Sequence, residues 1–214
     1  MLALANPEVL FEVDTERRAV ALTLDDGPHS EVTPRILDLL AEHEAHATFF
    51  LIGDRVEGNE DLMARMRAEG HELGNHLAHD EASIALSPES FEQKLVWSDS
   101  LINRSELSGK DEGKWFRPGS GWFNRRMVRQ VAAHGYRIAL GSVYPHDLMM
   151  RSPGLITSFI LGRVDPGSVL ILHDGDADAD RTIRVLERVL PALKMRGFEI
   201  LTLSELTALE VEGS

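Results

Sequence analysis

The chain has 214 residues, of which 43% are hydrophobic and 27% charged, a composition that suits one domain with a substantial core. Its formal net charge of −13 argues against nucleic acid or an anionic membrane surface as a partner, because both attract clustered Lys and Arg. The absence of cysteine excludes disulfides, thiolate metal sites and thiol nucleophiles. Any transition metal must therefore be held by His, Asp or Glu.

The segment Met1–Leu10 lacks the basic start and the long apolar stretch of a secretory signal, and no run approaches the length of a membrane span. The chain as it stands is therefore expected to be cytoplasmic. An exported protein whose leader is missing from the sequence would look the same, and its expected location would be extracellular. Nothing in the sequence sets an oligomeric state.

Short β-rich runs alternate with helical patterns along the chain. The predicted strands are Arg18–Leu24, Ala47–Ile52, Glu72–Asn75, Lys114–Phe116, Tyr136–Leu140, Ser168–Leu172 and Phe198–Leu203. The predicted helices are Thr33–His43 with Thr33 as its cap, Asn59–Glu69, Ser87 to about Arg104, Arg125–His134, one after Pro153, and Thr182–Met195.

About seven strands alternating with helices predict one α/β domain over residues 1–214, built on a parallel sheet. The sheet is either a closed barrel or an open, doubly wound one. In both architectures the chemistry collects at the carboxyl ends of the strands. Five predicted strands are followed there by reactive clusters: Asp25–Pro28, Asn75–Asp80, Arg117–Gly119, Ser142–Asp147 and His173–Asp174.

Asp25 and Asp26 are adjacent carboxylates, which repel each other unless a cation or an arginine compensates them. The alternative is that Asp26-Gly27-Pro28 is simply a turn signal. His76, His79 and Asp80 are spaced i, i+3 and i+4, so a helical turn there would project all three from one face, as a metal site needs. The alternative for this segment is a solvated polar loop.

His173 emerges from a strongly apolar strand, which favours a titrating acid or base over a buried core histidine once Asp174 and Asp147 are considered with it. Arg117 stands between Phe116 and Pro118 at a strand end. It is therefore expected to hold a buried carboxylate rather than a surface acid.

The order of these clusters resembles the polysaccharide deacetylase family, the carbohydrate esterases with the NodB-type domain, over a core of about residues 19–206. Thr-Leu-Asp-Asp-Gly-Pro is similar to that family's first motif, which implies Asp25 as general base and Asp26 as metal ligand. The Arg-Pro motif implies that Arg117 orients the base and that the Ser120 N–H helps to bind the oxyanion.

Two further roles follow from the same resemblance. Leu172-His173 is similar to the motif whose histidine is the general acid, and Asp147 matches the aspartate that tunes it. The family's fold, a distorted and incomplete (β/α) barrel, agrees with about seven parallel strands.

The second motif departs from the family pattern, which has its second histidine at i+4 from His76. Here that place holds Asp80, and a histidine comes one residue early at His79. We expect Asp80 to be the third ligand beside Asp26 and His76, with His79 as the alternative. The metal is then one divalent ion, zinc first, with cobalt, nickel or manganese as alternatives, because a second carboxylate favours harder cations.

The family's tryptophan after the fourth-motif aspartate is replaced by Leu148. Trp122, Phe123 and the loop Tyr144–Met150 are expected to supply substrate-binding surface instead. Trp115 fits either that role or core packing.

The resemblance implies a metal-dependent deacetylase that removes acetyl groups, chiefly N-acetyl groups from a chitin- or peptidoglycan-like amino-sugar polymer or oligomer. The alternatives are a sugar- or metal-binding homologue with impaired catalysis, and a deacetylase of O-acetyl esters or small acetylated compounds. Metal bound without acetate release would favour the binding protein.

Asp176, Asp178 and Asp180 superficially resemble a calcium-binding loop. Arg181 stands where such a loop needs glycine, so the segment is expected to be a solvated loop near the active site.

Overall fold

The computed structural model describes residues 8–103, 114–175 and 180–210. Its strands are β1 (Val9–Leu10), β2 (Ala19–Gly27), β3 (Thr48–Leu51), β4 (Glu72–Asn75), β5 (Lys114–Phe116), β6 (Tyr136–Ala139), β7 (Val169–His173) and β8 (Glu199–Leu201). Its α-helices are α1 (Val32–Glu42), α2 (Glu60–Ala68), α3 (Pro88–Ile102), α4 (Arg125–Ala133), α5 (Pro153–Leu161), α6 (Asp180–Met195) and α7 (Leu203–Thr207). Single 3-10 turns are η2 (Gly53–Arg55), η3 (Ser83–Ala85) and η4 (Gly119–Gly121).

The strands form one parallel sheet in the order β1-β6-β5-β4-β3-β2-β7, and β8 pairs with the first residues of β2. The described sheet does not close by a continuous ladder. Isolated bridges Val143↔Leu170 and Glu12↔Ser168 join β7 to segments that flank β6 and β1. The predicted incomplete barrel is therefore confirmed, and the fully closed alternative is not what the sheet forms.

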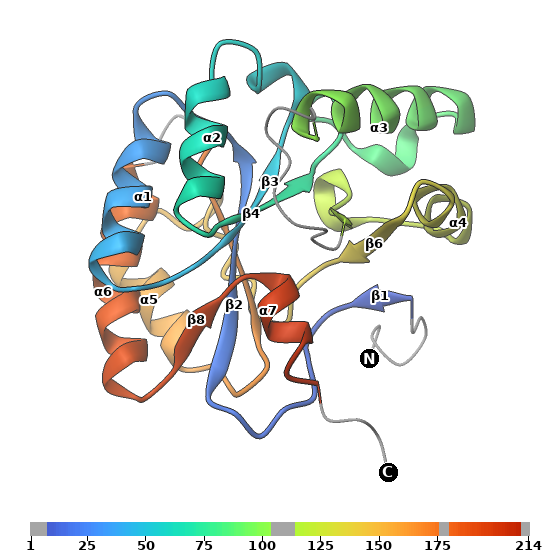
Figure 1. The fold of residues 1–214 in the computed structure, drawn as a ribbon. Helices are drawn as coiled ribbons and strands as arrows, with labels where there is room; N and C mark the ends of the chain where they lie inside the picture. The colour runs from blue at the N-terminus through green and yellow to red at the C-terminus, as the bar shows by residue number, and fades with distance from the viewer. Residues whose placement is uncertain (1–7, 104–113, 176–179, 211–214) are drawn as a thin grey trace.

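Strand β2 pairs with β3, β7 and β8, and all nine of its residues are buried. Helices α1, α5 and α6 lie together on one side of it (Figure 1). The largest apolar cluster fills the space between these helices and β2, β3 and β7. This continuous core fixes the direction in which the carboxyl ends of the strands point.

Several predicted boundaries were wrong. The last strand ends at Leu201, because Thr202 caps α7 with a reciprocal Thr202–Glu205 capping box. Strand β1, which pairs two residues with β6, was not predicted. Thr33 does not cap α1, which begins at Val32; instead its hydroxyl donates to Asp174 Oδ2 at 2.6 Å.

Asp176 and Asp178 lie outside the described residues. No helix in the described part of the chain combines the length and the hydropathy that crossing a bilayer requires.

Candidate active site

The predicted clusters meet at the carboxyl edge of the sheet. Asp25, in β2, lies opposite Phe50 of β3 and His173 of β7 in the strand register. A cavity of about 210 Å³ opens at this edge. Its lining includes all the residues predicted for a metal or for catalysis except Asp147 and His79: Asp25, Asp26, His76, Asp80, Arg117 and His173.

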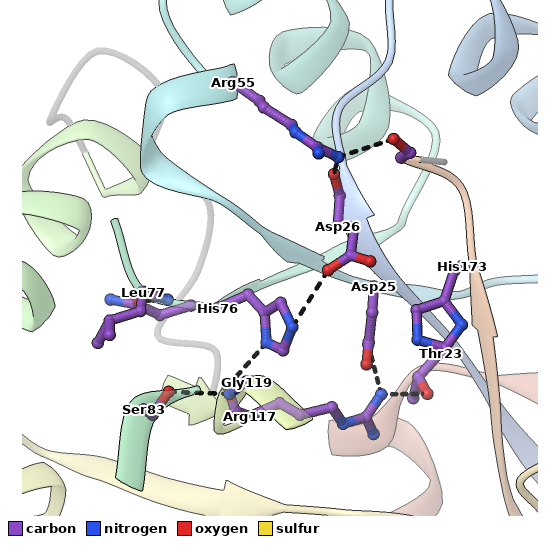
Figure 2. A network of polar contacts seen from close by, with 12 residues as sticks. Thr23, Asp25, Asp26, Arg55, His76, Leu77, Ser83, Arg117, Gly119 and His173 are labelled. Carbon is purple, nitrogen blue, oxygen red and sulfur yellow. Dashed lines mark hydrogen bonds and ion pairs between the residues drawn. The ribbon is translucent and has the colours of Figure 1, made fainter. Parts of the chain in front are cut away.

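Asp25 is held by Arg117. Arg117 Nη1 donates to Asp25 Oδ1 at 2.6 Å and to Thr23 Oγ1 at 2.7 Å (Figure 2). Its remaining nitrogens donate to the carbonyls of Ala139 and Leu140, both at 3.0 Å. Burial lowers the pKa of Arg117, and the charge of Asp25 opposes that change. The guanidinium, only 2% exposed, thus fixes Asp25 with one carboxylate edge turned to the cavity.

Asp26 faces His76 rather than Arg117. His76 Nε2 lies 3.3 Å from Asp26 Oδ1, and His76 Nδ1 lies 2.8 Å from the Arg117 carbonyl. That carbonyl can only accept, so Nδ1 carries a proton and Nε2 is the nitrogen turned to the cavity. In Figure 2, Asp25 and Asp26 lie between His76 on one side and His173 on the other.

Asp26 and His76 each favour the charged form of the other. Burial acts to raise the pKa of Asp26, but the hydrogen bond and charge of His76 outweigh it and lower the pKa. Burial acts to lower the pKa of His76, yet Asp26 and Asp25 raise it overall. The cavity therefore stabilises positive charge between Asp26 and His76, the condition that a cation site requires.

His173 is paired with Asp147 on the other side of the cavity. Asp147 Oδ1 lies 2.9 Å from His173 Nδ1, and Oδ2 accepts the His173 backbone N–H at 3.0 Å. Burial acts to lower the pKa of His173, but Asp147, followed by Asp25 and Asp26, raises it to about 9. The histidine is therefore protonated at neutral pH, as a general acid must be.

The segment after β4 is not helical, so the expectation that His76, His79 and Asp80 share one helix face was wrong. Leu77 has a φ of +73°, and Asn75 Oδ1 accepts the Leu77 N–H at 2.8 Å. His76 and Asp80 line the catalytic cavity. His79 instead lies against a separate cavity, where its Nδ1 pairs with Asp54.

No three His, Asp or Glu side chains of the described residues lie close enough together to hold a metal ion. Asp26 and His76 are in contact, whereas Asp80 is an exposed residue on the wall of the same cavity. The predicted ligands are thus brought to one cavity but not gathered into a coordination shell.

Backbone strain concentrates around the cavity. Among non-glycine residues of the described chain, positive φ angles occur at Asp26, Leu77, Ser120, His146 and Glu44, and the first four stand at the carboxyl end of a strand or in a segment that follows one. Such conformations cost roughly 1–3 kcal/mol each and persist where the surroundings impose them. This distribution supports a functional role for the edge.

Close packing explains why positions 27 and 175 are glycine. A Cβ at Gly27 would lie 2.6 Å from Asp174 Oδ1, so the residue after Asp26 must lack a side chain. A Cβ at Gly175 would clash with the Asp26 carbonyl and with Arg55.

Sequence reasoning missed Arg55, Thr23 and the role of Asp174. Arg55 Nη1 donates to the Asp26 carbonyl and, at 2.9 Å, to that of Gly175, so it ties the ends of β2 and β7 together (Figure 2). Thr23 stands two residues before Asp25 on the same face of β2, a spacing that could have indicated it. Asp174 is fully buried, and burial, followed by the charges of Asp26 and Asp25, raises its pKa to about 7.

A larger apolar cavity of about 700 Å³ adjoins the catalytic one, and Ser120 and Tyr144 line both. Trp122, with 65% of its surface exposed, and Phe123 form part of its wall. The Tyr144 ring lies 6.0 Å from that of His173. Trp115 is a core residue, only 2% exposed, so it offers no substrate surface.

Comparison with known proteins gives the same result from sequence and from structure. The sequence model of the polysaccharide deacetylase family matches residues 12–139. A peptidoglycan-N-acetylglucosamine deacetylase of Bacillus cereus is 33% identical, with 92% of each chain covered. A chitooligosaccharide deacetylase of Bradyrhizobium is 34% identical, with 88% of this chain and 90% of the relative covered.

Solved structures extend the likeness. A peptidoglycan N-acetylglucosamine deacetylase in complex with 4-naphthalen-1-yl-N-oxidanyl-benzamide superposes with a TM-score of 0.88 at 28% identity, covering 99% of each chain. A family 4 acetyl xylan esterase from Clostridium thermocellum, in complex with a cobalt ion, gives 0.81 at 28% identity, covering 89% of this chain and 91% of that one.

Proposed function

Because this chain belongs to the polysaccharide deacetylase family, we propose that it hydrolyses N-acetyl groups of an amino-sugar polymer or oligomer at the cavity around Asp25 and Asp26. The observation that carries the proposal is that Asp25, held by Arg117, and His173, held by Asp147, line one cavity. This arrangement supplies a fixed base and a protonated acid to a single substrate group.

The residues fit a divalent metal. Asp26 and His76 Nε2 would hold it, with Asp80 as the third ligand because it lines the same cavity whereas His79 does not. A bound divalent metal would supply Lewis acidity at the acetyl carbonyl and lower the pKa of a bound water. Zinc is our first candidate, with cobalt, nickel and manganese as alternatives, and the cobalt ion in the esterase relative supports an ion of this class.

The chain's own groups divide the proton transfers. Asp25, fixed by Arg117, takes a proton from the attacking water. The Ser120 N–H stabilises the developing oxyanion, since the preceding N–H, that of Gly119, already donates to Ser83 Oγ at 2.9 Å. His173 gives its proton to the leaving nitrogen, and Asp147 stabilises the charged imidazole before that transfer.

The acid favours an amide over an ester substrate. An amine leaves only after it is protonated, and the raised pKa of His173, about 9, holds a proton ready for it. Trp122 and Tyr144 provide the apolar surface on which a sugar ring can lie beside the cavity. The relatives that act on peptidoglycan and on chitooligosaccharides support an N-acetylglucosamine polymer as the substrate class.

The decisive experiment uses the Asp25→Asn variant of the metal-loaded protein. Acetate release from N-acetylglucosamine oligomers should fall by roughly 10²–10⁴-fold, the typical contribution of a general base. Bound metal, measured by elemental analysis, should stay close to one ion per chain, because Asp26 and His76 are unchanged. Wild-type turnover in Asp25→Asn would show that the base is wrongly assigned. Metal binding without acetate release in the parent protein would favour a binding homologue.

A further inference from the structure

A third cavity is open to solvent and lies beside the loop that follows β4. It measures about 430 Å³, and six residues line it: Asp54, Ala78, His79, Gln93, Lys94 and Trp97. They come from η2, from the loop after β4 and from α3, which packs against both β4 and η2. His76 and Asp80 of the same loop face the catalytic cavity. The loop after β4 therefore contributes residues to both cavities.

Trp97 presents a fixed aromatic surface in this cavity. Its side chain is 44% exposed, yet a Cβ at Gly53 would lie 2.6 Å from its six-membered ring, so the ring is seated on the η2 backbone. The His79 ring lies beside it, with centroids 6.4 Å apart and planes inclined by 33°. A large exposed ring that is held in place loses little conformational freedom when a ligand covers it.

Polar groups surround the two rings. Asp54 pairs with His79 Nδ1, and Lys94 pairs with Glu81, so the charges near the rings are largely balanced. Gln93 is exposed and adds an amide donor and acceptor. A ligand that suits this surface has an apolar face for the rings and hydroxyl or amide groups at its rim. A sugar ring has that pattern, whereas an acidic peptide or a wholly apolar ligand does not.

We propose that Trp97 and His79 form a binding subsite for a second sugar unit of the glycan whose acetylated unit occupies the catalytic cavity. This inference rests on the proposed function and deepens it, because it places a second unit of the glycan on residues outside the catalytic cavity. The histidine that stands one residue early in the second motif thereby has a role. Asp80 faces the catalytic cavity, and His79 is left to bind substrate.

The test compares chain lengths. For the parent protein, Trp97→Ala, His79→Ala and the control Val96→Ala, kcat/KM for acetate release is measured on N-acetylglucosamine itself and on its pentamer. Val96 is also 44% exposed on α3 but does not line the cavity. The pentamer-to-monomer ratio of kcat/KM should fall roughly 3- to 12-fold in Trp97→Ala, the range expected for loss of one stacking contact. His79→Ala should lower the ratio less, and Val96→Ala should not change it.

Binding measurements keep this inference separate from the proposed function. The pentamer is titrated calorimetrically into metal-loaded Asp25→Asn with and without Trp97→Ala. Weaker binding in the double variant would support the subsite even if the parent releases no acetate. An unchanged ratio together with unchanged binding would overturn it. An equal loss on the single sugar and the pentamer would also overturn it, because damage to the fold predicts that result.

Discussion

Strand β4 carries buried polar side chains at both of its ends, and the two ends use them differently. At the amino end, Glu72 accepts from Thr48 Oγ1 at 2.7 Å, from Ser204 N at 3.2 Å and from Ser204 Oγ. These donors enclose the carboxylate in protein and hold α7 on the sheet. At the carboxyl end, His76 shares a cavity with Asp25 and Asp26, and the groups there face space that a ligand can enter.

The difference shows what separates a structural polar cluster from a reactive one. Both are buried, and both join carboxylates to partners on neighbouring elements. At the amino end hydrogen bonds enclose both oxygens of the carboxylate, so little is left for chemistry. At the carboxyl end two carboxylates are adjacent and two histidines have raised pKa values, a balance that favours a bound cation and proton transfer.

The largest effect should follow from removing a ligand at the carboxyl end. Asp80→Ala is expected to weaken metal affinity by at least about 100-fold, more than the usual cost of losing a group behind a ligand. His79→Ala should keep parent affinity, since His79 faces the other cavity. Competition with a chromogenic chelator measures both. The reverse ranking would make His79 the ligand and would remove the structural reason for its substrate role.

The pH dependence of activity should report the raised pKa of His173, the proposed general acid. His173 must be protonated to act, so kcat/KM should decline as pH rises through about 9. Asp147→Asn removes the main group that raises this pKa, and the alkaline decline should move to lower pH. A pH–rate profile of metal-saturated protein measures the shift. Asp165→Asn, which changes a carboxylate that is not among those raising the pKa of His173, is the control and should leave the profile in place.

The carboxyl edge was predictable because its chemistry follows from one rule. In a parallel sheet the residues after successive strands converge, so Asp25, His76 and His173 could be placed together from strand assignment alone. The family and the incomplete barrel are confirmed by the comparisons. The conformation after β4 was not predictable, because the positive φ at Leu77, which is incompatible with a helical turn there, leaves no mark in the residue pattern.

The hydrogen-bonded cluster around Glu72, at the amino end of β4, was not predicted for a different reason. Glu72 and Ser204 are 132 residues apart, and their contact depends on how the last helix packs under the sheet. From the sequence, Glu72 beside His71 is as suggestive of a site as Asn75 beside His76. Only the hydrogen-bond donors around the Glu72 carboxylate distinguish the amino end of β4 from its carboxyl end.

Glu72→Gln should therefore change stability and spare the chemistry. The amide nitrogen would face donors that need an acceptor, which typically costs about 1–3 kcal/mol of the free energy of unfolding. Urea unfolding of metal-free protein measures this without the contribution of metal binding. Acetate release at 25 °C should keep the parent kcat. A lowered kcat with unchanged stability would mean that the two ends are coupled through β4.

The last effect is confined to acid pH and concerns His71, the buried histidine at the amino end of β4. His71 is 2% exposed, its Nδ1 accepts the Ala47 N–H at 3.2 Å, and burial, with the charges of His46 and Arg65, lowers its pKa to about 4. The unfolded chain binds a proton at this side chain near pH 6.5 and the folded chain does not. The contribution of His71 to stability is therefore complete above pH 6.5 and is lost as the pH falls toward 4, by up to about 3 kcal/mol.

His71→Asn keeps an acceptor near the Nδ1 position but cannot titrate. The stability of the metal-free variant should fall less steeply than that of the parent between pH 6.5 and 4, as measured by urea unfolding at several pH values. His43→Asn is the matched control, because His43 lies near the same end of the molecule but is only partly buried. If His71→Asn and the parent lose stability in parallel, His71 takes up its proton in the folded state. The amino end of β4 would then also stabilise positive charge. The cavity at the carboxyl end would be the remaining difference between the two ends.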